Sequence, residues 1–331
     1  MIEPSLTIGI EEEYQIIDPE TRELRSYVQQ FLEQGHAVLP DQLRPEFLQS
    51  QIEAGTQICA DITEARTELL RIRRSILELA ENAGLWVAAA GTHPFSSWVK
   101  QQVSPFGRYP ELVRFLQDVG RQLLVFGMHV HVGIEDHELL IEIMNQLRYF
   151  LPHLLALSTS SPFWHGRETG LKSYRSVVFE NLPRTGIPPQ FGAFASYRSY
   201  VDTLLSTGSI AETTHIWWDV RPSEKFPTLE IRIPDMCTRI EETLCLVAIV
   251  QAIIAKLIQL RRANQSWRLY RKHLIDENKW RALRYGIGGK LIDFGKKKEV
   301  RFPELVEEIL AWIDDVVDEL DSPEASAGEI G

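Results

Sequence analysis

The chain has 331 residues, of which 35 are basic and 46 are acidic, giving a formal net charge of -11 at pH 7. Its 44% hydrophobic and 24% charged residues are typical of a globular protein and exclude a largely disordered one. The acidic excess disfavours nucleic-acid binding, which needs many basic side chains to neutralise phosphates. A small anion remains compatible with this charge if metal ions and a few arginines supply a local positive field.

The sequence shows no sign of export or of a membrane span. Cys59, Cys237 and Cys245 are too few and too scattered for a disulfide framework. No basic and apolar leader precedes the first predicted strand, and the most apolar run, residues 244–254, is too short to cross a bilayer. We therefore expect a cytoplasmic protein without a membrane partner, in which this run is a buried helix.

The first predicted element is a strand over residues 7–17, TIGIEEEYQII, because β-branched and aromatic residues dominate it. Strand alternation places Glu11 and Glu13 on one face and Glu12 on the other. Two carboxylates about 7 Å apart on one face resist ionisation unless a cation or a partner neutralises them. An exposed edge strand with solvated acids is the alternative interpretation.

A second polar strand is predicted within residues 47–59, FLQSQIEAGTQIC. Its alternation places Glu53 on the same face as Gln49 and Gln51. This polar row resembles the face that carries Glu11 and Glu13, so the two strands are expected to share one environment.

The remaining elements mix long helices with short strands. Helices are predicted over residues 61–84, 110–119, 136–158, 195–205, 241–263 and 302–320, and strands over 86–90, 122–134, 215–220 and 228–233. Because strands and helices do not alternate strictly, the order favours an α+β fold with a largely antiparallel, curved sheet covered by helices. We expect a single domain over residues 1–320 and a disordered tail over 321–331.

Two later strands carry further polar faces. In GMHVHV, His129 and His131 share one face of an otherwise apolar strand; a histidine satisfied within the core is the alternative. In TLEIRIPD, Glu230 and Arg232 share one face with Thr228, and a simple salt bridge is the alternative.

If these faces form one surface, it holds four carboxylates and two imidazoles and therefore needs cations. Oxygen-rich ligand sets with a lone imidazole suit Mg²⁺ or Mn²⁺ better than Zn²⁺. Mg²⁺ commonly arrives with phosphates, which makes an ATP site the natural inference. Arg175, Arg221 and Arg232 would then neutralise phosphate oxygens.

Five motifs, GIEEE, GMHVHVG, SPFWHGRETGLKSYR, WWDVRPS and PTLEIRIPD, occur in an order and spacing that resemble the YbdK-type carboxylate-amine ligases, relatives of glutamate cysteine ligase. The resemblance extends from about residue 8 to KWRALRYG at residues 279–286. GMHVH and LEIR also resemble strands of glutamine synthetase. The resemblance implies a sheet-lined funnel that carries two or three Mg²⁺ ions, with ATP entering from one end and the acid and amine from the other.

The resemblance also implies roles for individual residues. The implied metal ligands are Glu11, Glu13, Glu53, His129 and Glu230. The implied phosphate and catalytic residues are His131, Arg175, Arg221 and Arg232. The implied substrate contacts are Trp164, Thr169, Tyr174, Arg175 and Asp219. Glu12 lies on the wrong face for a ligand and is expected to be paired beneath the sheet.

Such a site would phosphorylate a carboxylate with ATP and let an amine displace phosphate from the acyl phosphate. Glutamate and cysteine, or another small amine, are the expected substrates. A metal-dependent hydrolase with the same cluster and an ATP-binding regulator that has lost activity are the alternatives. Long amphipathic helices make a homodimer plausible.

Overall fold

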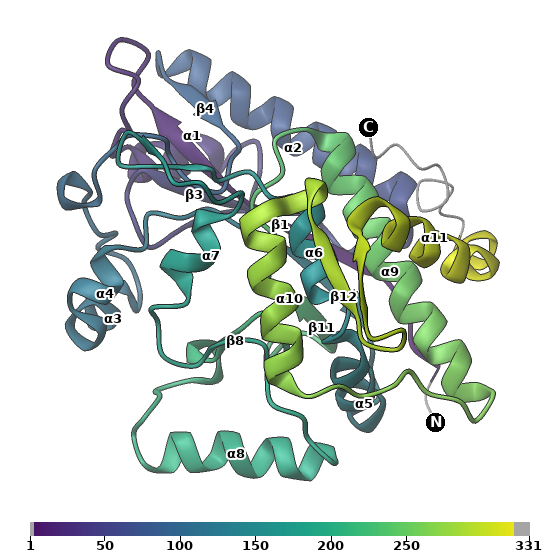
Figure 1. Ribbon diagram of the computed structural model, residues 1–331. Coiled ribbons are helices and arrows are strands. Elements are labelled where there is room, and N and C mark those ends of the chain that lie inside the picture. Colours follow the sequence, from purple (N-terminus) through teal and green to yellow (C-terminus); the bar gives the residue numbers. More distant parts are fainter. Residues whose placement is uncertain (1–2, 321–331) are drawn as a thin grey trace.

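The computed structural model describes residues 3–320 and is organised around a seven-stranded sheet (Figure 1). The strand order is β10-β11-β5-β1-β3-β2, with β4 also pairing with β1, and every pair is antiparallel. The bounds are Ile8–Ile17 (β1), Leu43–Pro45 (β2), Gln51–Gly55 (β3), Trp86–Ala88 (β4), Met128–Gly133 (β5), Val220–Pro222 (β10) and Thr228–Ile231 (β11). The predicted α+β fold with a largely antiparallel sheet is confirmed.

Helices and three small two-stranded sheets complete the described residues. The helices are Val28–Gly35 (α1), Ile62–Asn82 (α2), Tyr109–Leu116 (α3), Asp118–Arg121 (α4), His137–Leu147 (α5), Leu151–Ser158 (α6), Tyr174–Phe179 (α7), Phe194–Ser206 (α8), Ile240–Arg262 (α9), Lys272–Tyr285 (α10) and Phe302–Val317 (α11). The small sheets pair Phe163–Trp164 (β6) with Arg167–Glu168 (β7), Thr185–Gly186 (β8) with Trp217–Trp218 (β9), and Lys290–Asp293 (β12) with Lys298–Arg301 (β13).

Helix α9 is the apolar helix of the core. By length and composition alone it could cross a membrane, but 78% of its most apolar window is buried inside the protein. It packs against α2, α5, α6 and α11. The prediction that the apolar run 244–254 forms a buried helix is therefore confirmed.

The apolar face of the sheet is closed by α2 and α9, and Glu12 is buried there. Its carboxylate accepts hydrogen bonds from Arg73 Nε at 3.0 Å and from Thr243 Oγ1 at 2.9 Å, and only 1% of the residue is exposed. The expectation that Glu12 is paired beneath the sheet is confirmed, because Arg73 comes from α2 and Thr243 from α9.

The predicted strand over 122–134 is too long, since only Met128–Gly133 belongs to β5. The same edge of β1 pairs with β5 through Glu12 and then with β4 from Gln15 onward, so residues before 128 have no ladder partner there. β4 is also less buried than predicted, because Trp86 is 54% exposed.

The predicted helix over 136–158 is two helices, α5 and α6. A break at residues 148–150 separates them, and Pro152 lies in the first turn of α6. Proline lacks a backbone N–H and cannot continue an uninterrupted helix, whereas it is tolerated in a first turn. Helix α10 and the β12–β13 hairpin were not predicted, and the predicted tail over 321–331 lies outside the described residues.

Candidate active site

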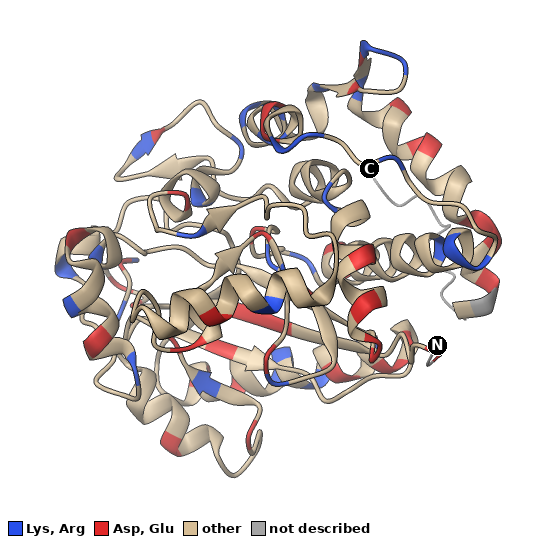
Figure 2. Ribbon diagram, turned by 90° about the horizontal axis from the view of Figure 1, so that it is seen from below, with Lys and Arg blue, Asp and Glu red and all other residues tan. Residues whose placement is uncertain are grey.

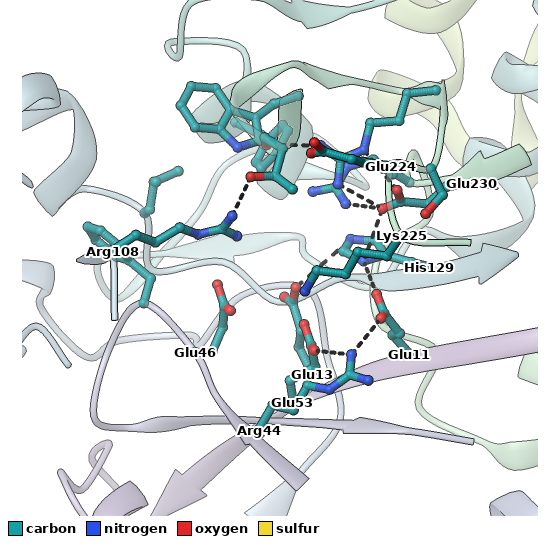
Figure 3. A pocket seen from close by; sticks show the side chains of 18 of the residues that line it. Glu11, Glu13, Arg44, Glu46, Glu53, Arg108, His129, Glu224, Lys225 and Glu230 are labelled. Atoms are coloured by element: carbon teal, nitrogen blue, oxygen red, sulfur yellow. Dashed lines mark hydrogen bonds and ion pairs between the residues drawn. The ribbon is translucent and has the colours of Figure 1, made fainter. Parts of the chain in front are cut away.

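A cavity of about 1390 Å³, part of it open to solvent, lies over the polar face of the sheet (Figure 3). The acidic positions on the strands that cross the middle of the molecule are visible in Figure 2. The sequence-predicted residues that line the cavity are Glu11, Glu13, Glu53, His129, His131, Arg175, Arg221, Glu230 and Arg232. The sheet therefore brings four distant chain segments to one surface.

The strand register arranges the polar residues of this face in rows across the sheet. The middle row pairs Glu11 with His129. Two residues away along the strands, one row pairs His131 with Glu230, which is itself opposite Arg221 on β10. On the other side of the middle row, Glu13 is opposite Glu53, and Glu53 is opposite Arg44 on β2. The cavity floor thus has an arginine-bearing end at β10 and a carboxylate end at β3.

Glu11 is the centre of the polar cluster. Its Oε2 lies 3.2 Å from His129 Nδ1 and 3.7 Å from His131 Nε2. Burial opposes the shift, but the two imidazoles hold the pKa of Glu11 well below its usual range. Each of Glu11, His131 and Glu230 offers a ligand atom, and these atoms lie within 4.8 Å of one another. Such a group could hold one metal ion.

The carboxylate end is short of positive charge. Burial, and then repulsion from Glu46, raise the pKa of Glu13 to about 7. Burial, and then Glu11, raise the pKa of Glu53 well above its usual range. Arg44 lies 3.0 Å from Glu11 and 3.5 Å from Glu53, and 43% of its side chain is exposed.

Glu46 is a pocket residue that the sequence analysis missed. Its carboxylate accepts a hydrogen bond from the Tyr109 hydroxyl at 3.0 Å, and burial raises its pKa. It lies between β2 and β3, so no strand alternation marked it. Figure 3 shows Glu46 beside Glu13 and Glu53 in the cavity.

The residues present fit a divalent metal ion. His131 Nδ1 lies 2.9 Å from Thr228 Oγ1, whereas its buried Nε2 has no hydrogen-bond partner within the described residues. This free nitrogen and the carboxylates with raised pKa values form an oxygen-rich donor set that lacks compensating charge. The sequence analysis assigned His129 as the metal ligand, but the ligand-sized group contains His131 instead.

Two arginines meet on Glu230 at the other end of the cavity. Arg221 Nε donates to Glu230 Oε2 at 2.8 Å, and Arg232 pairs with the other oxygen. Burial opposes the shift, but Arg221 and Arg232 hold the pKa of Glu230 well below its usual range. Buried Arg232 Nε has no hydrogen-bond partner in residues 3–320 and could donate to an anion.

Arg175 is buried in the cavity wall. Its guanidinium donates to the carbonyl oxygens of Ile233 and Arg232, both at 3.2 Å. A Cβ at Gly127 would lie 2.2 Å from Arg175 Nη2, so only glycine lets the guanidinium lie this close to the strand. Gly127 N also donates to Glu13 Oε2 at 2.6 Å.

Four predicted substrate contacts do not line the cavity: Trp164, Thr169, Tyr174 and Asp219. The rings of Trp164 and Tyr174 pack on each other with centroids 5.4 Å apart, and Thr169 Oγ1 donates to Pro162 O at 2.9 Å. Asp219 instead accepts from buried Lys279 Nζ at 2.7 Å. The geometry of the pocket gives these four residues no contact with a ligand inside it.

Asp235 is a second residue without a predicted role. Its carboxylate accepts hydrogen bonds from Ser161 Oγ at 2.6 Å, Ser173 Oγ at 2.7 Å and Ser160 N at 3.0 Å. Since Ser173 caps the helix that carries Arg175, Asp235 fixes the loop behind the cavity wall. The motif PTLEIRIPD contained it, but its partners lie over 60 residues earlier in the sequence.

The comparisons with known proteins agree with this geometry. The model of glutamate–cysteine ligase family 2 matches residues 7–322. A protein of Herpetosiphon aurantiacus, provisionally named glutamate–cysteine ligase 2, is 55% identical over 316 residues, covering 96% of this chain and 82% of that protein. A protein of Roseiflexus castenholzii with the same provisional name is 54% identical, with 96% and 83% covered.

Solved structures share the fold. The glutamate–cysteine ligase of Francisella tularensis in complex with AMP superimposes with a TM-score of 0.68 at 13% identity, covering 98% of this chain and 80% of that one. A bifunctional glutathione synthetase from Pasteurella multocida gives a TM-score of 0.64 at 12% identity, covering 97% and 48%. The chain belongs to glutamate–cysteine ligase family 2 and is an ATP-dependent ligase that forms an amide bond.

Proposed function

We propose that this ligase activates the γ-carboxylate of glutamate as an acyl phosphate and transfers the acyl group to an amine of the cysteine type. One observation carries the proposal: a single cavity holds a row of carboxylates and imidazoles with two arginines at one end. The family description and the names of the relatives support glutamate and cysteine as the substrate class.

The metal proposed for the carboxylate cluster is Mg²⁺. The residues that would hold it are Glu11, Glu13, Glu53 and Glu230, with His129 or His131. When bound, Mg²⁺ would screen the repulsion between the acid and the γ-phosphate and stabilise charge on the transferring group.

Arg221 and Arg232 are proposed to orient the phosphates, because their guanidinium groups lie at the end of the cavity away from Glu53. Each arginine would exchange part of its contact with Glu230 for a phosphate oxygen, and Arg232 has a free Nε for this purpose. Fixed donors at developing charge stabilise a transition state without reorganisation.

Arg175 is proposed to orient the acid, since its guanidinium lies between the acidic rows and the wall formed by α7. His131, held through Nδ1 by Thr228, would face the γ-phosphate or the metal through Nε2. We place the reaction in the cytoplasm and keep a homodimer as a prediction.

The alternatives receive less support. A hydrolase would need no nucleotide, yet two arginines converge on the carboxylate cluster at Glu230. A decayed regulator would retain the nucleotide end and lose the acid end, but both ends of the cluster have their charged residues.

The experiment incubates purified protein with ATP, Mg²⁺, L-glutamate and hydroxylamine and measures ADP and hydroxamate. Both products are expected, because hydroxylamine traps an acyl phosphate. Arg232→Met should lower hydroxamate formation by about a hundredfold or more. The matched control Arg25→Met changes an arginine whose side chain is 60% exposed and far from the cavity lining, and should keep activity. Absence of both products with every acid tried would refute the proposed function.

A further inference from the structure

The cavity has an apolar end that the activation of the acid does not use. The apolar side chains that line it are Phe47, Leu112, Leu123, Val125, Phe179 and Leu182. They come from the β2–β3 loop, from α3, from the segment before β5, and from α7 and the residues that follow it. Four chain segments therefore contribute to one apolar wall.

The strand register locates this wall at the end opposite to the proposed phosphate site. Val125 precedes β5, so it lies beyond Gly127, whose amide is bound to Glu13. Its carbonyl oxygen accepts from Gln51 Nε2 at 2.7 Å, and Gln51 is one pair beyond Glu53 on the same face of β3. The wall therefore adjoins the Glu13–Glu53 row, whereas Arg221 lies two rows away in the other direction.

Other contacts give the same location. The ring of Phe47 packs edge-on against Tyr109 with centroids 6.0 Å apart, and Tyr109 donates to Glu46. The Arg175 guanidinium lies 5.4 Å from the centroid of the Phe179 ring. The acyl group held by Arg175 would thus have the wall on one side and the arginine-bearing end on the other.

The main polar side chain at this end is already bonded. Gln51 donates to Val125 O and accepts from Leu48 N at 3.2 Å, so both ends of its amide are used. A polar substituent that entered here would lose its bonds to water without gaining this partner. An apolar substituent would gain contact with aliphatic and aromatic carbon.

We propose that the acceptor is a primary amine with an apolar side chain larger than the thiol-bearing methylene of cysteine, such as a branched aliphatic amino acid. The proposal rests on the proposed function and names the amine class of the same site. Cysteine would fill only part of a wall built from six apolar side chains. A branched side chain of four carbons would contact more of it, and each added methylene in an apolar pocket improves selectivity about tenfold or more.

The test compares L-leucine with L-cysteine and with L-asparagine, which has nearly the shape of leucine and a polar end. With ATP, Mg²⁺ and L-glutamate, kcat/KM should be at least about tenfold higher for leucine than for cysteine. It should be about a hundredfold lower for asparagine than for leucine, because the amide would be left unpaired. Equal or greater use of cysteine or asparagine would overturn the proposal.

A substitution in the wall locates the binding surface. Leu123 is only partly buried, so Leu123→Gln alters the wall without opening the core. It should reduce the leucine-to-hydroxylamine ratio of kcat/KM about tenfold and leave KM for ATP unchanged. The matched control Leu77→Gln, at a 50% exposed position on α2, should leave that ratio unchanged. A rise in KM for ATP instead would mean that the wall binds adenine and would overturn the proposal.

Binding is measured separately from turnover. Isothermal titration calorimetry of the full chain with Mg²⁺ and a non-hydrolysable ATP analogue should detect leucine, with weaker binding to Leu123→Gln. Hydroxamate formation with no preference for leucine would refute the amine class and leave the proposed function intact. Absence of hydroxamate would refute the proposed function, and absence of leucine binding in the same protein would then also refute the apolar amine site.

Discussion

Glu11 and His129 are opposite each other in the β1–β5 ladder, and their side chains meet at 3.2 Å. The contact forms because both residues lie on the cavity face of adjacent antiparallel strands. Glu11 also approaches His131, so one carboxylate connects both imidazoles of β5. The charge on Glu11 should therefore control how well the cluster binds a cation.

Glu11→Gln should abolish most of the stabilisation that Mg²⁺ gives the protein. For the wild type, Mg²⁺ at a hundred times its Kd should add about 2.7 kcal/mol to the free energy of unfolding, because it binds only the folded chain. Urea unfolding with and without Mg²⁺ measures this difference. Glu78→Gln, an exposed position on α2, serves as the control. Equal stabilisation of Glu11→Gln and wild type by Mg²⁺ would show that the cation binds elsewhere.

Glu12→Gln should behave differently although the residue is next to Glu11. Its carboxylate is buried against Arg73, and breaking a buried pair by removing one charge costs about 3–5 kcal/mol. Urea unfolding without added metal should therefore show a large loss of stability. The increment added by Mg²⁺ should remain, since Glu12 is on the other face of the sheet. A loss of that increment in a folded variant would contradict the separation of the two faces.

Lys279→Met should destabilise the wall of the cavity. Lys279 Nζ lies 2.7 Å from both Asp219 and Glu180, and the backbone oxygen of Asp219 accepts from Arg232 N at 2.8 Å. Removing the ammonium leaves buried Asp219 unpaired, at a cost of about 3–5 kcal/mol in the free energy of unfolding.

The double variant Lys279→Met with Asp219→Asn should recover part of this loss, because it removes the unpaired charge. Urea unfolding of both single variants and of the double variant measures the coupling energy. Additive losses would show that the two side chains act independently.

The polar face could be predicted from sequence because strand alternation is a local property. Period-two patterns separated Glu11 and Glu13 from Glu12, and the structure has them on opposite faces. Which row each residue joins could not be predicted, since register depends on how strands from distant segments pair. The exchange of His129 for His131 in the ligand-sized group is a result of that register.

Residues outside regular strands were harder to find. Glu46 lies in a loop and reaches the cavity only because β2 and β3 pair. Asp219 was taken for a substrate contact because its motif is rich in charge, but its partner Lys279 is 60 residues away. A local pattern shows that such a residue is unusual, and only the folded chain shows what it contacts.

Acid should destabilise the protein partly through His153, which is far from the cavity lining. Burial lowers its pKa from 6.5 to about 4, its Nδ1 has no hydrogen-bond partner in the described residues, and aromatic rings of Tyr149 and Phe302 surround it. The unfolded chain binds a proton at this histidine below pH 6.5, while the folded chain does so only near pH 4. Stability is therefore fully present above the unfolded pKa and is lost as the pH falls from 6.5 toward 4.

His153→Phe should remove this dependence and retain about 3 kcal/mol more of its neutral-pH stability than the wild type at pH 4. Urea unfolding of both proteins at several pH values, in a chelator, measures the difference. His129 contributes equally to both curves, because burial also lowers its pKa to about 4 and it is unchanged in the variant. Parallel curves for the two proteins would mean that His153 is already protonated in the fold, or that water reaches it. A buried ring of similar shape without a titratable nitrogen then makes the slope between the two pKa values a direct count of the protons taken up at this position.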